Sequence, residues 1–498
     1  MNRKYRKRKT PRFFFIISLA LFLFIGIGYS VINSNLSMQG NVVRKATTWS
    51  IGFADPVFDT GSITNPTPTI TNGNTMNMSV NLINPGDIYA FTVDLKNTGS
   101  VPALINTLNI TQLTQEQENY LRWKVEYEDE STPAVGDLLK AGETKKVHIS
   151  LEYKKLRATD LYPTSAVNIN LTVSANFYLP EESFNTVTLT KNGSIKNIQV
   201  SNLEQEVTLD DFPIESTDQV IACNNGVEPS TDTNDKIVLS KIKQDATCRI
   251  EPSLASAVTN SSTKVTNMAI LQDAITDTRL TIETNQNIIL NLNKKVYTFT
   301  TGNDQPQLTV NGILKIKDDN KTGEMKTTQQ RLLDCTGNSS CTITNAHIGR
   351  YNNSTLGSTI RGGGNFTIKQ SIIDGDRAIT LSAHTSNTNI NVYKTTIRNN
   401  GNHMPVTIEA SSTITNIYNS SIVSGYYIGT NIATFSNSKI YICNSTYTGT
   451  LTLGDYNNDN QQATYYYYNT TFKNGTLVPT ISNNSNNNVK ETPLACAE

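Results

Sequence analysis

Short runs of alternating apolar and polar residues cover most of this 498-residue chain, and in its C-terminal half one run returns at a nearly constant interval. ITNAHIG, IKQSIID and IYNSSIV are three copies, which begin at residues 343, 368 and 417. Alternation with a period of two predicts β-strands. A repeat of about 20–50 residues is typical of a solenoid, and because no helical pattern separates the copies, a β-solenoid is predicted.

Three columns of the repeat define its expected core. The first apolar column is Ile343, Ile368, Val392, Ile417, Ile442 and Tyr467. Three positions later stands a column of small residues, which is Ala346, Ser371, Thr395, Ser420, Ser445 and Thr470. Two positions further on is a second apolar column, which is Ile348, Ile373, Ile397, Ile422, Tyr447 and Phe472. All three columns keep the same regular spacing, so we expect the apolar ones to stack inside the solenoid.

A fourth column lies just before the small residues and is mostly Asn. Its members are Asn345, Gln370, Lys394, Asn419, Asn444 and Asn469. Asn tolerates the left-handed backbone conformation that a tight corner between two strands requires, and stacked amides can hydrogen-bond between rungs. A buried ammonium without a partner is costly, so Lys394 is expected to point outward.

Strand alternation also predicts which side chains of the repeat face solvent. Five tyrosines fall at outward positions on one face and are candidate ligand-binding residues, namely Tyr393, Tyr418, Tyr441, Tyr466 and Tyr468. Exposed aromatic rings of this kind can stack on sugars or anchor a protein partner. The alternative is that tyrosine is frequent here because it favours strands.

The N-terminal half is expected to contain two further β units. Residues 33–180 have short alternating runs separated by turn residues, which predict an antiparallel β-sandwich. One short helix is predicted at residues 113–121, with Thr114 as its cap and Gln117 returning the bond. Residues 181–255 predict a small β module, and residues 256–480 the solenoid. At the start of the solenoid, Met268, Leu271, Ala274 and Ile275 have helical spacing and predict a short amphipathic helix.

The N-terminus predicts a membrane-associated or exported protein. Residues 1–12 contain seven basic side chains, and residues 13–32 are twenty residues without a charge. Such a run fits a transmembrane anchor with a cytoplasmic N-terminus, or alternatively a cleaved signal peptide. Of 42 basic residues, 35 remain for the rest of the chain against 42 acidic ones, a balance of −7, so a nucleic-acid partner is not expected. The bulk of the chain is expected outside the cell.

Six cysteines in an exported chain predict disulfides. Proximity in the sequence favours Cys223–Cys248 and Cys335–Cys341, which leaves Cys443 with Cys496. The four histidines are scattered and there is no CxxC motif, so neither a metal site nor a cofactor is predicted.

Several stretches resemble known bacterial surface proteins. GYSVINSNLSMQGNVV at 28–43, NPGDIYAFTVDLKNTGS at 84–100 and LKAGETKKVHISLEY at 139–153 are similar to Gram-positive surface proteins related to camelysin and biofilm-fibre subunits. The chain lacks the usual Ala-containing processing site of the fibre subunits. The CNNG segment with TC at 247–248 resembles disulfide-linked β modules of bacterial surface proteins, and residues 261–319 resemble the entry to a right-handed parallel β-helix of the pectate-lyase type.

A catalytic site is a further possibility, because bacterial β-helices include pectin-degrading enzymes. Glycoside hydrolysis needs two carboxylates, and uronate lyases need a base with a cation site. The best candidate is the turn of Asp374, Asp376 and Arg377, although an Asp-Gly-Asp sequence is more often only a turn. The Gly-His-Gly and Arg-Ile-Lys motifs of polygalacturonases are absent.

The expected fold is therefore all-β, with a flexible tail at residues 481–498. The expected function is that of a non-enzymatic, adhesin-like surface protein that binds a glycan or a surface protein. A polysaccharide lyase or hydrolase is the first alternative, and a structural subunit of a surface fibre is the second.

Overall fold

The computed structural model describes residues 48–491, apart from 65, 156–162, 164–166, 262–264, 301–304, 352–356, 376–378, 384–385, 400–404, 409, 425–427, 431–437, 449–452, 456–463, 473–480 and 483–488. The predicted anchor at residues 13–32 and most of the predicted tail lie outside the described residues. Within the described part of the chain, no helix is long and apolar enough to cross a membrane.

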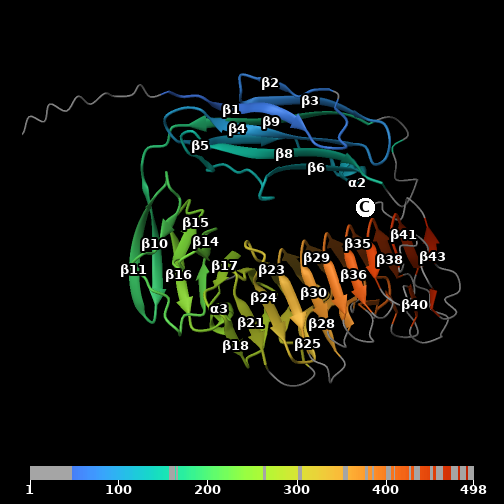
Figure 1. Cartoon of the computed structure of the whole chain (residues 1–498). Coiled ribbons are helices and arrows are strands. Elements are labelled where there is room, and N and C mark those ends of the chain that lie inside the picture. Colours follow the sequence, from blue (N-terminus) through green and yellow to red (C-terminus); the bar gives the residue numbers. More distant parts are fainter. Residues whose placement is uncertain are drawn as a thin grey trace, which may run out of the picture. The chain divides into compact units, whose positions relative to one another are not determined.

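Residues 51–178 form two antiparallel sheets around one core (Figure 1). The first sheet has the order β1 (Ile51–Phe58), β4 (Ile88–Asn97), β8 (Thr144–Tyr153) and β6 (Leu121–Tyr127). The second has the order β2 (Thr69–Thr71), β3 (Thr75–Leu82), β9 (Val167–Tyr178), β5 (Ala103–Ile110) and β7 (Leu138–Leu139). Alternate residues of these strands are buried, as in β3, where Met76, Met78, Val80 and Leu82 face the core. The described residues in this region thus form the predicted sandwich.

The predicted capping box is confirmed. Helix α2 (Gln115–Tyr120) begins after Thr114, whose hydroxyl accepts a hydrogen bond from the amide of Gln117 at 3.2 Å. The Gln117 side chain in turn accepts from the amide of Thr114 at 2.8 Å. The two bonds satisfy two backbone donors that a helix start leaves without partners.

The small module continues directly into the solenoid through one shared sheet. Its strands follow the order β11 (Ser194–Ser201), β10 (Phe184–Lys191), β16 (Ala246–Glu251) and β13 (Val220–Cys223), and β13 pairs with the first solenoid strand, β17 (Val265–Ile270). A second, three-stranded sheet consists of β12 (Val207–Thr208), β15 (Ile237–Ser240) and β14 (Glu228–Thr231).

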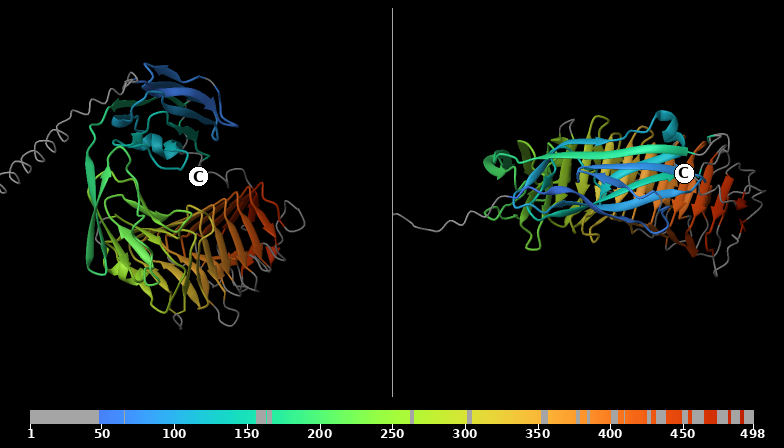
Figure 2. Two further views of the ribbon diagram at one scale, coloured as in Figure 1. Left: turned by 60° about the vertical axis from the view of Figure 1, so that its left-hand side comes forward. Right: turned by 90° about the horizontal axis from the view of Figure 1, so that it is seen from above.

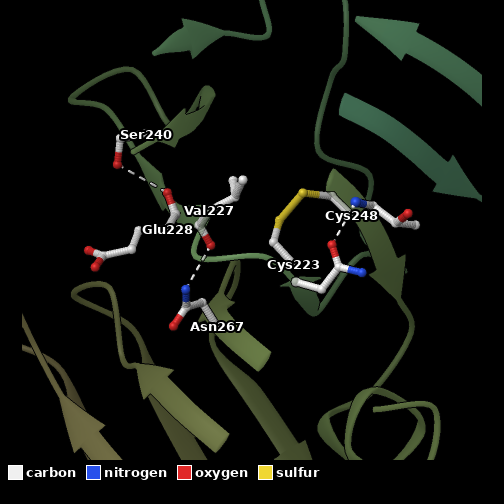
Figure 3. Close-up of a disulfide and its surroundings, with 8 residues drawn as sticks. Cys223, Val227, Glu228, Ser240, Cys248 and Asn267 are labelled. Atoms are coloured by element: carbon white, nitrogen blue, oxygen red, sulfur yellow. Dashed lines mark hydrogen bonds between the residues drawn. A yellow bond between two sulfur atoms is a disulfide. The ribbon is translucent and has the colours of Figure 1, made fainter. Parts of the chain in front are cut away.

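The predicted disulfide of this module is confirmed (Figure 3). Cys223 and Cys248 are opposite residues of β13 and β16, and their Cα atoms are 4.1 Å apart. Beside the disulfide, the Asn267 side chain donates a hydrogen bond to the carbonyl of Val227 at 2.9 Å. Cys335–Cys341 is confirmed as well. Cys443 is also disulfide-bonded, but its predicted partner Cys496 lies outside the described residues.

The helix predicted around Met268 is wrong. Met268 lies in strand β17, and Ala274 and Ile275 lie in β18 (Ala274–Thr276). The helix at the start of the solenoid is α3 (Leu254–Thr259), which begins after Ser253 and buries Leu254, Ala257 and Val258. Five of the six residues of β17 are buried. A strand buried on both faces has no alternation by which a period of two could be recognised.

The C-terminal part is a parallel β-solenoid with three sheets (Figure 1). The first sheet contains β17, β20 (Asn287–Asn291), β23 (Ile313–Lys317), β26 (Ser340–Thr344), β29 (Asn365–Lys369), β32 (Asn389–Tyr393), β35 (Ile414–Tyr418), β38 (Lys439–Cys443), β41 (Thr464–Tyr468) and β43 (Val489–Glu491). The second contains β18, β21 (Val296–Phe299), β24 (Glu324–Thr327), β27 (His347–Arg350), β30 (Ile372–Gly375), β33 (Thr396–Asn399), β36 (Ser421–Ser424) and β39 (Thr446–Thr448).

The third sheet contains β19 (Leu280–Ile282), β22 (Leu308–Val310), β25 (Arg331–Cys335), β28 (Ser358–Gly362), β31 (Ile379–Ala383), β34 (Val406–Ile408), β37 (Ile428–Thr430), β40 (Leu453–Asp455) and β42 (Ile481–Ser482). Figure 2 shows the stacked strands from two further directions. Both predicted apolar columns lie in the single solenoid core.

The corner column behaves as predicted. All six residues from Asn345 to Asn469 have left-handed backbone conformations, with φ between 46° and 56°. Lys394 is exposed, as expected for a side chain that would be costly to bury. The amide of Asn469 donates to the side-chain oxygen of Asn444 at 2.9 Å, so one pair of stacked amides forms the expected bond between rungs.

The small-residue column forms a ladder of hydrogen bonds inside the solenoid. The hydroxyl of Ser420 accepts from the amide of Thr395 in the preceding rung at 3.1 Å and donates to the carbonyl of Tyr418 in its own rung at 2.7 Å. Ser371, Thr395 and Ser445 make the same two bonds in their rungs. A small hydroxyl side chain thus satisfies buried backbone groups next to these four corners, where the strand ladder is interrupted.

Candidate functional site

A cluster of charged and aromatic side chains lies on the outer face of the second solenoid sheet, around Asp374. Parallel pairing places Lys326 of β24, Gly349 of β27, Asp374 of β30 and Arg398 of β33 in one column across the sheet. The neighbouring residues Ile348, Ile373 and Ile397 point into the core. Because side chains alternate along a strand, the column of Asp374 faces outward.

Residues two positions before this column face outward as well. Glu324 and His347 are paired residues of β24 and β27, and they precede Lys326 and Gly349 by two positions. Tyr351 follows the end of β27. Four rungs thus bring together six residues, which are Glu324, Lys326, His347, Tyr351, Asp374 and Arg398. We call them the Asp374 cluster.

Both oxygens of the Asp374 carboxylate are held by fixed partners. Arg398 donates from Nε at 2.6 Å and from Nη2 at 2.7 Å, which makes a bidentate pair. His347 Nε2 lies 2.7 Å from Oδ2, and the hydroxyl of Tyr351 lies 3.2 Å from the same oxygen. Burial raises the pKa of Asp374, but hydrogen bonds from His347 and Arg398 outweigh burial and bring the pKa below its usual value. Asp374 is therefore an ionised structural anchor.

The second carboxylate of the cluster belongs to Glu324, which contacts the remaining side chains. Its Oε1 accepts a hydrogen bond from the hydroxyl of Tyr351 at 2.6 Å and lies 3.5 Å from His347 Nδ1. Its Oε2 is 2.9 Å from the ammonium of Lys326. Burial, followed by the hydrogen bond to Glu324, raises the pKa of Tyr351, so this phenol stays protonated and acts as a donor.

Burial differs sharply between the acids and the bases of the cluster. The side chains of Asp374 and Glu324 are 9 % and 14 % exposed, whereas those of Arg398, Lys326 and His347 are 41 %, 32 % and 27 % exposed. Tyr351 is also partly exposed. The carboxylates thus form the floor, and the cationic groups and the phenol form the surface that a ligand would contact.

This arrangement changes the candidate catalytic set. Of the three predicted residues, Asp374 is central to the cluster, but as an ion-paired support and not as an acid with a proton to donate. Asp376 and Arg377 lie outside the described residues. Sequence reasoning missed Glu324, Lys326, His347, Tyr351 and Arg398. The repeat did contain one usable signal, because His347, Asp374 and Arg398 each adjoin the second apolar column.

The five predicted tyrosines lie on the first solenoid sheet, but not all are open to solvent. Tyr418 and Tyr441 are only 5 % and 3 % exposed, so the prediction of outward exposure is wrong for these two. They form a separate apolar cluster with Cys443, against which Tyr393 and Tyr466 pack. Tyr393 stacks on Tyr418 with ring centroids 5.5 Å apart, and Tyr441 stacks on Tyr466 at 4.7 Å. Rings that shield one another in this way leave less surface for a ligand. Their ligand-binding role stays a prediction.

Among the described residues, no group of three or more His, Cys, Asp or Glu side chains is arranged to hold a metal ion. The chain was compared with protein-family models, with curated proteins and with solved structures, and none of the three comparisons found a match.

Proposed function

We propose that this chain is a surface protein whose β-solenoid binds anionic glycans without altering them, and that the Asp374 cluster is the binding site. The observation that carries the proposal is the burial difference within the cluster. The two carboxylates lie beneath the surface, and a guanidinium, an ammonium, an imidazole and a phenol lie above them. Charged donors held by buried acceptors are suited to a carboxylate or sulfate group.

A sugar also fits the aromatic member of the cluster. The ammonium of Lys326 is 6.0 Å from the centre of the Tyr351 ring. A partly exposed ring beside charged donors offers an apolar face and a polar edge, which matches a sugar ring with its C–H face and hydroxyl edge. This combination favours a glycan over a small inorganic anion.

The proposed location at the cell surface has separate support. Disulfides persist in oxidising environments, and the two that the described residues form, Cys223–Cys248 and Cys335–Cys341, are consistent with export. The basic segment and the apolar run at residues 13–32 support an anchor or signal, and the resemblance to camelysin-type surface proteins points the same way.

A uronate lyase is the second candidate, because the cluster places possible bases beside cations. Lyase chemistry requires a base near the carbon to be deprotonated and positive charge near the uronate carboxylate. His347 and Tyr351 would be the bases, and Lys326 and Arg398 the cations. The raised pKa of Tyr351 argues against this phenol as a base at neutral pH.

The test is binding of the full-length chain to three polysaccharides, which are polygalacturonate, dextran sulfate and neutral dextran. Lys326→Gln removes an ammonium whose described partner is Glu324 and should weaken binding to the two anionic polymers about tenfold. Lys439→Gln, which removes an exposed ammonium from β38 of the first solenoid sheet, is the matched control and should have little effect.

Equal affinity of the wild-type chain for dextran and dextran sulfate would contradict the proposal. The same incubation with polygalacturonate distinguishes the lyase, because β-elimination creates unsaturated ends that absorb ultraviolet light. Product formation that is lost in His347→Gln would replace binding by catalysis as the function.

A further inference from the structure

His347 lies in the Asp374 cluster at a position where an added proton would change its contacts. The imidazole lies between two carboxylates, with Nε2 2.7 Å from Asp374 Oδ2 and Nδ1 3.5 Å from Glu324 Oε1. Since the Asp374 carboxylate only accepts hydrogen bonds, Nε2 must carry a proton. In the neutral imidazole, Nδ1 then has no proton and presents a lone pair to a carboxylate oxygen.

Protonation of His347 would convert this unfavourable approach into an ion pair. An Nδ1–H group would donate toward Glu324 Oε1, the atom that also accepts from the Tyr351 hydroxyl at 2.6 Å. The cationic imidazole would then donate to Asp374 at Nε2 and form an ion pair with Glu324, whose Oε1 lies 3.5 Å from Nδ1. No backbone movement is required, because both acceptors already lie in place.

The same proton changes the net charge of the cluster. Among the described residues, the charged and titratable groups that face His347 are Glu324 and Lys326 of β24, Tyr351 after β27, Asp374 of β30 and Arg398 of β33. With a neutral imidazole, two carboxylates balance one ammonium and one guanidinium, so the charge is zero. With a protonated imidazole the charge is +1, and His347 itself is 27 % exposed on the side where a ligand would bind.

We infer that His347 is a pH switch that strengthens binding of anionic glycans when the surroundings become mildly acidic. This inference rests on the proposed function of the Asp374 cluster. Imidazoles change charge between about pH 5 and 8, a range in which sulfate esters and Arg398 keep theirs. A single added charge at contact distance in a partly solvated site should change the affinity about threefold to tenfold.

The experiment measures the affinity of the full-length chain for dextran sulfate at about pH 5.5 and pH 8, between which imidazoles titrate. The polymer keeps its charge over this range, so only the protein titrates. The wild-type chain should bind about threefold to tenfold more tightly at the lower pH. His347→Gln should bind weakly and equally at both values, and His347→Lys, which keeps a positive charge, should bind tightly and equally at both.

The matched control is His148→Gln. His148 is another imidazole beside a carboxylate, with Nδ1 3.0 Å from Asp59 Oδ2, but it belongs to β8 of the sandwich. This variant should keep the wild-type pH dependence. A wild-type affinity that is equal at both pH values, or a pH dependence that survives in His347→Gln, overturns the inference and leaves the proposed function standing. A wild-type chain that binds no anionic glycan at either pH contradicts the proposed function itself.

Discussion

Tyr351 lies directly over Gly349, two residues before it in the chain. A Cβ atom at Gly349 would be 2.6 Å from the Tyr351 hydroxyl oxygen and 2.7 Å from two ring carbons. No real Cβ tolerates such distances, so the ring must move if the glycine is replaced. Gly349→Ala should therefore displace Tyr351 from Glu324 and weaken glycan binding severalfold. The free energy of unfolding should change by no more than about 1 kcal/mol, because the obstructing atoms belong to a movable side chain.

Tyr351→Phe, measured in the same binding assay, distinguishes the contribution of the aromatic ring from that of the hydroxyl group. This variant keeps the aromatic face but loses the hydrogen bond to Glu324 at 2.6 Å. Full wild-type affinity in both Gly349→Ala and Tyr351→Phe would show that Tyr351 has no part in binding.

Ser420→Ala tests the hydroxyl ladder of the solenoid. The change leaves the amide of Thr395 without the acceptor that it contacts at 3.1 Å, in a fully buried position. An unsatisfied buried donor costs about 1–3 kcal/mol, and urea unfolding should show a loss of this size. Ser421→Ala, one residue later and only partly buried, should have a much smaller effect. Equal losses in the two variants would mean that the ladder does not contribute specifically.

Lys394→Asn should stabilise the protein. Lys394 adopts a left-handed conformation with φ of 48°, which asparagine tolerates better than lysine. The corner neighbours Asn419 and Asn444 show that asparagine fits the same place in other rungs. The expected gain in the free energy of unfolding is up to about 1 kcal/mol, measured by urea unfolding. A loss of stability would indicate that the lysine side chain makes a favourable contact on the surface.

The two disulfides should differ in their contribution to stability. Cys223 and Cys248 are 25 residues apart, whereas Cys335 and Cys341 are separated by 6. On the chain-entropy account, the longer loop contributes about 3–4 kcal/mol and the shorter one about 2 kcal/mol. Paired Cys→Ser variants, compared by their unfolding midpoints in urea, should follow this order. The reverse order would mean that local packing outweighs loop entropy.

The ion pairs of Asp374 should survive mild acid. Because the folded-state pKa is lower than the ordinary value, the stabilisation by Asp374 is fully present above the unfolded-state pKa of about 4 and is lost as the pH falls through the folded-state value. The wild-type chain should thus still melt at a higher temperature than Asp374→Asn at pH 5, and this advantage should shrink only below about pH 4. A difference that disappears near pH 6 would show that another group controls it.

The sequence alone predicted the solenoid because its physical causes recur in every rung. Ile343 and Ile368 are paired neighbours in adjacent strands, as the regular spacing of the repeat indicated. The corner at Asn345 could be predicted as well, because few residue types adopt its left-handed backbone conformation without strain. Thr114 and Gln117 formed their capping box because both partners lie within one turn of the chain.

The sequence pattern did not identify strand β17, and the reason is physical. Its residues are buried on both faces, so the spacing of Met268 and of Leu271, which follows the strand, fits a helix as well as a strand. The exposure of Tyr418 was also misjudged, because alternation tells which side of the sheet a ring takes but not what packs against it.

The sequence repeat did not predict the Asp374 cluster, because one rung of the solenoid is irregular. In most rungs two residues separate the first sheet from the second, as between Thr344 and His347. Between Lys317 and Glu324 there are six. The regular spacing of the later rungs therefore could not place Glu324 and Lys326 beside His347, and the cluster emerged only from the strand pairing itself.

The hydroxyl ladder has a consequence for how such a chain can change its length. The rungs of Ser371, Thr395, Ser420 and Ser445 present to one another the same amide, hydroxyl and carbonyl groups in the same positions, so a complete rung of this kind can be exchanged for another. Removing residues 414–438 as one block would join rungs whose edges already match, and the solenoid would become shorter by one strand spacing of about 4.8 Å. Removing any smaller segment would leave mismatched edges. The length of the solenoid can therefore change only by the gain or loss of complete rungs, one at a time.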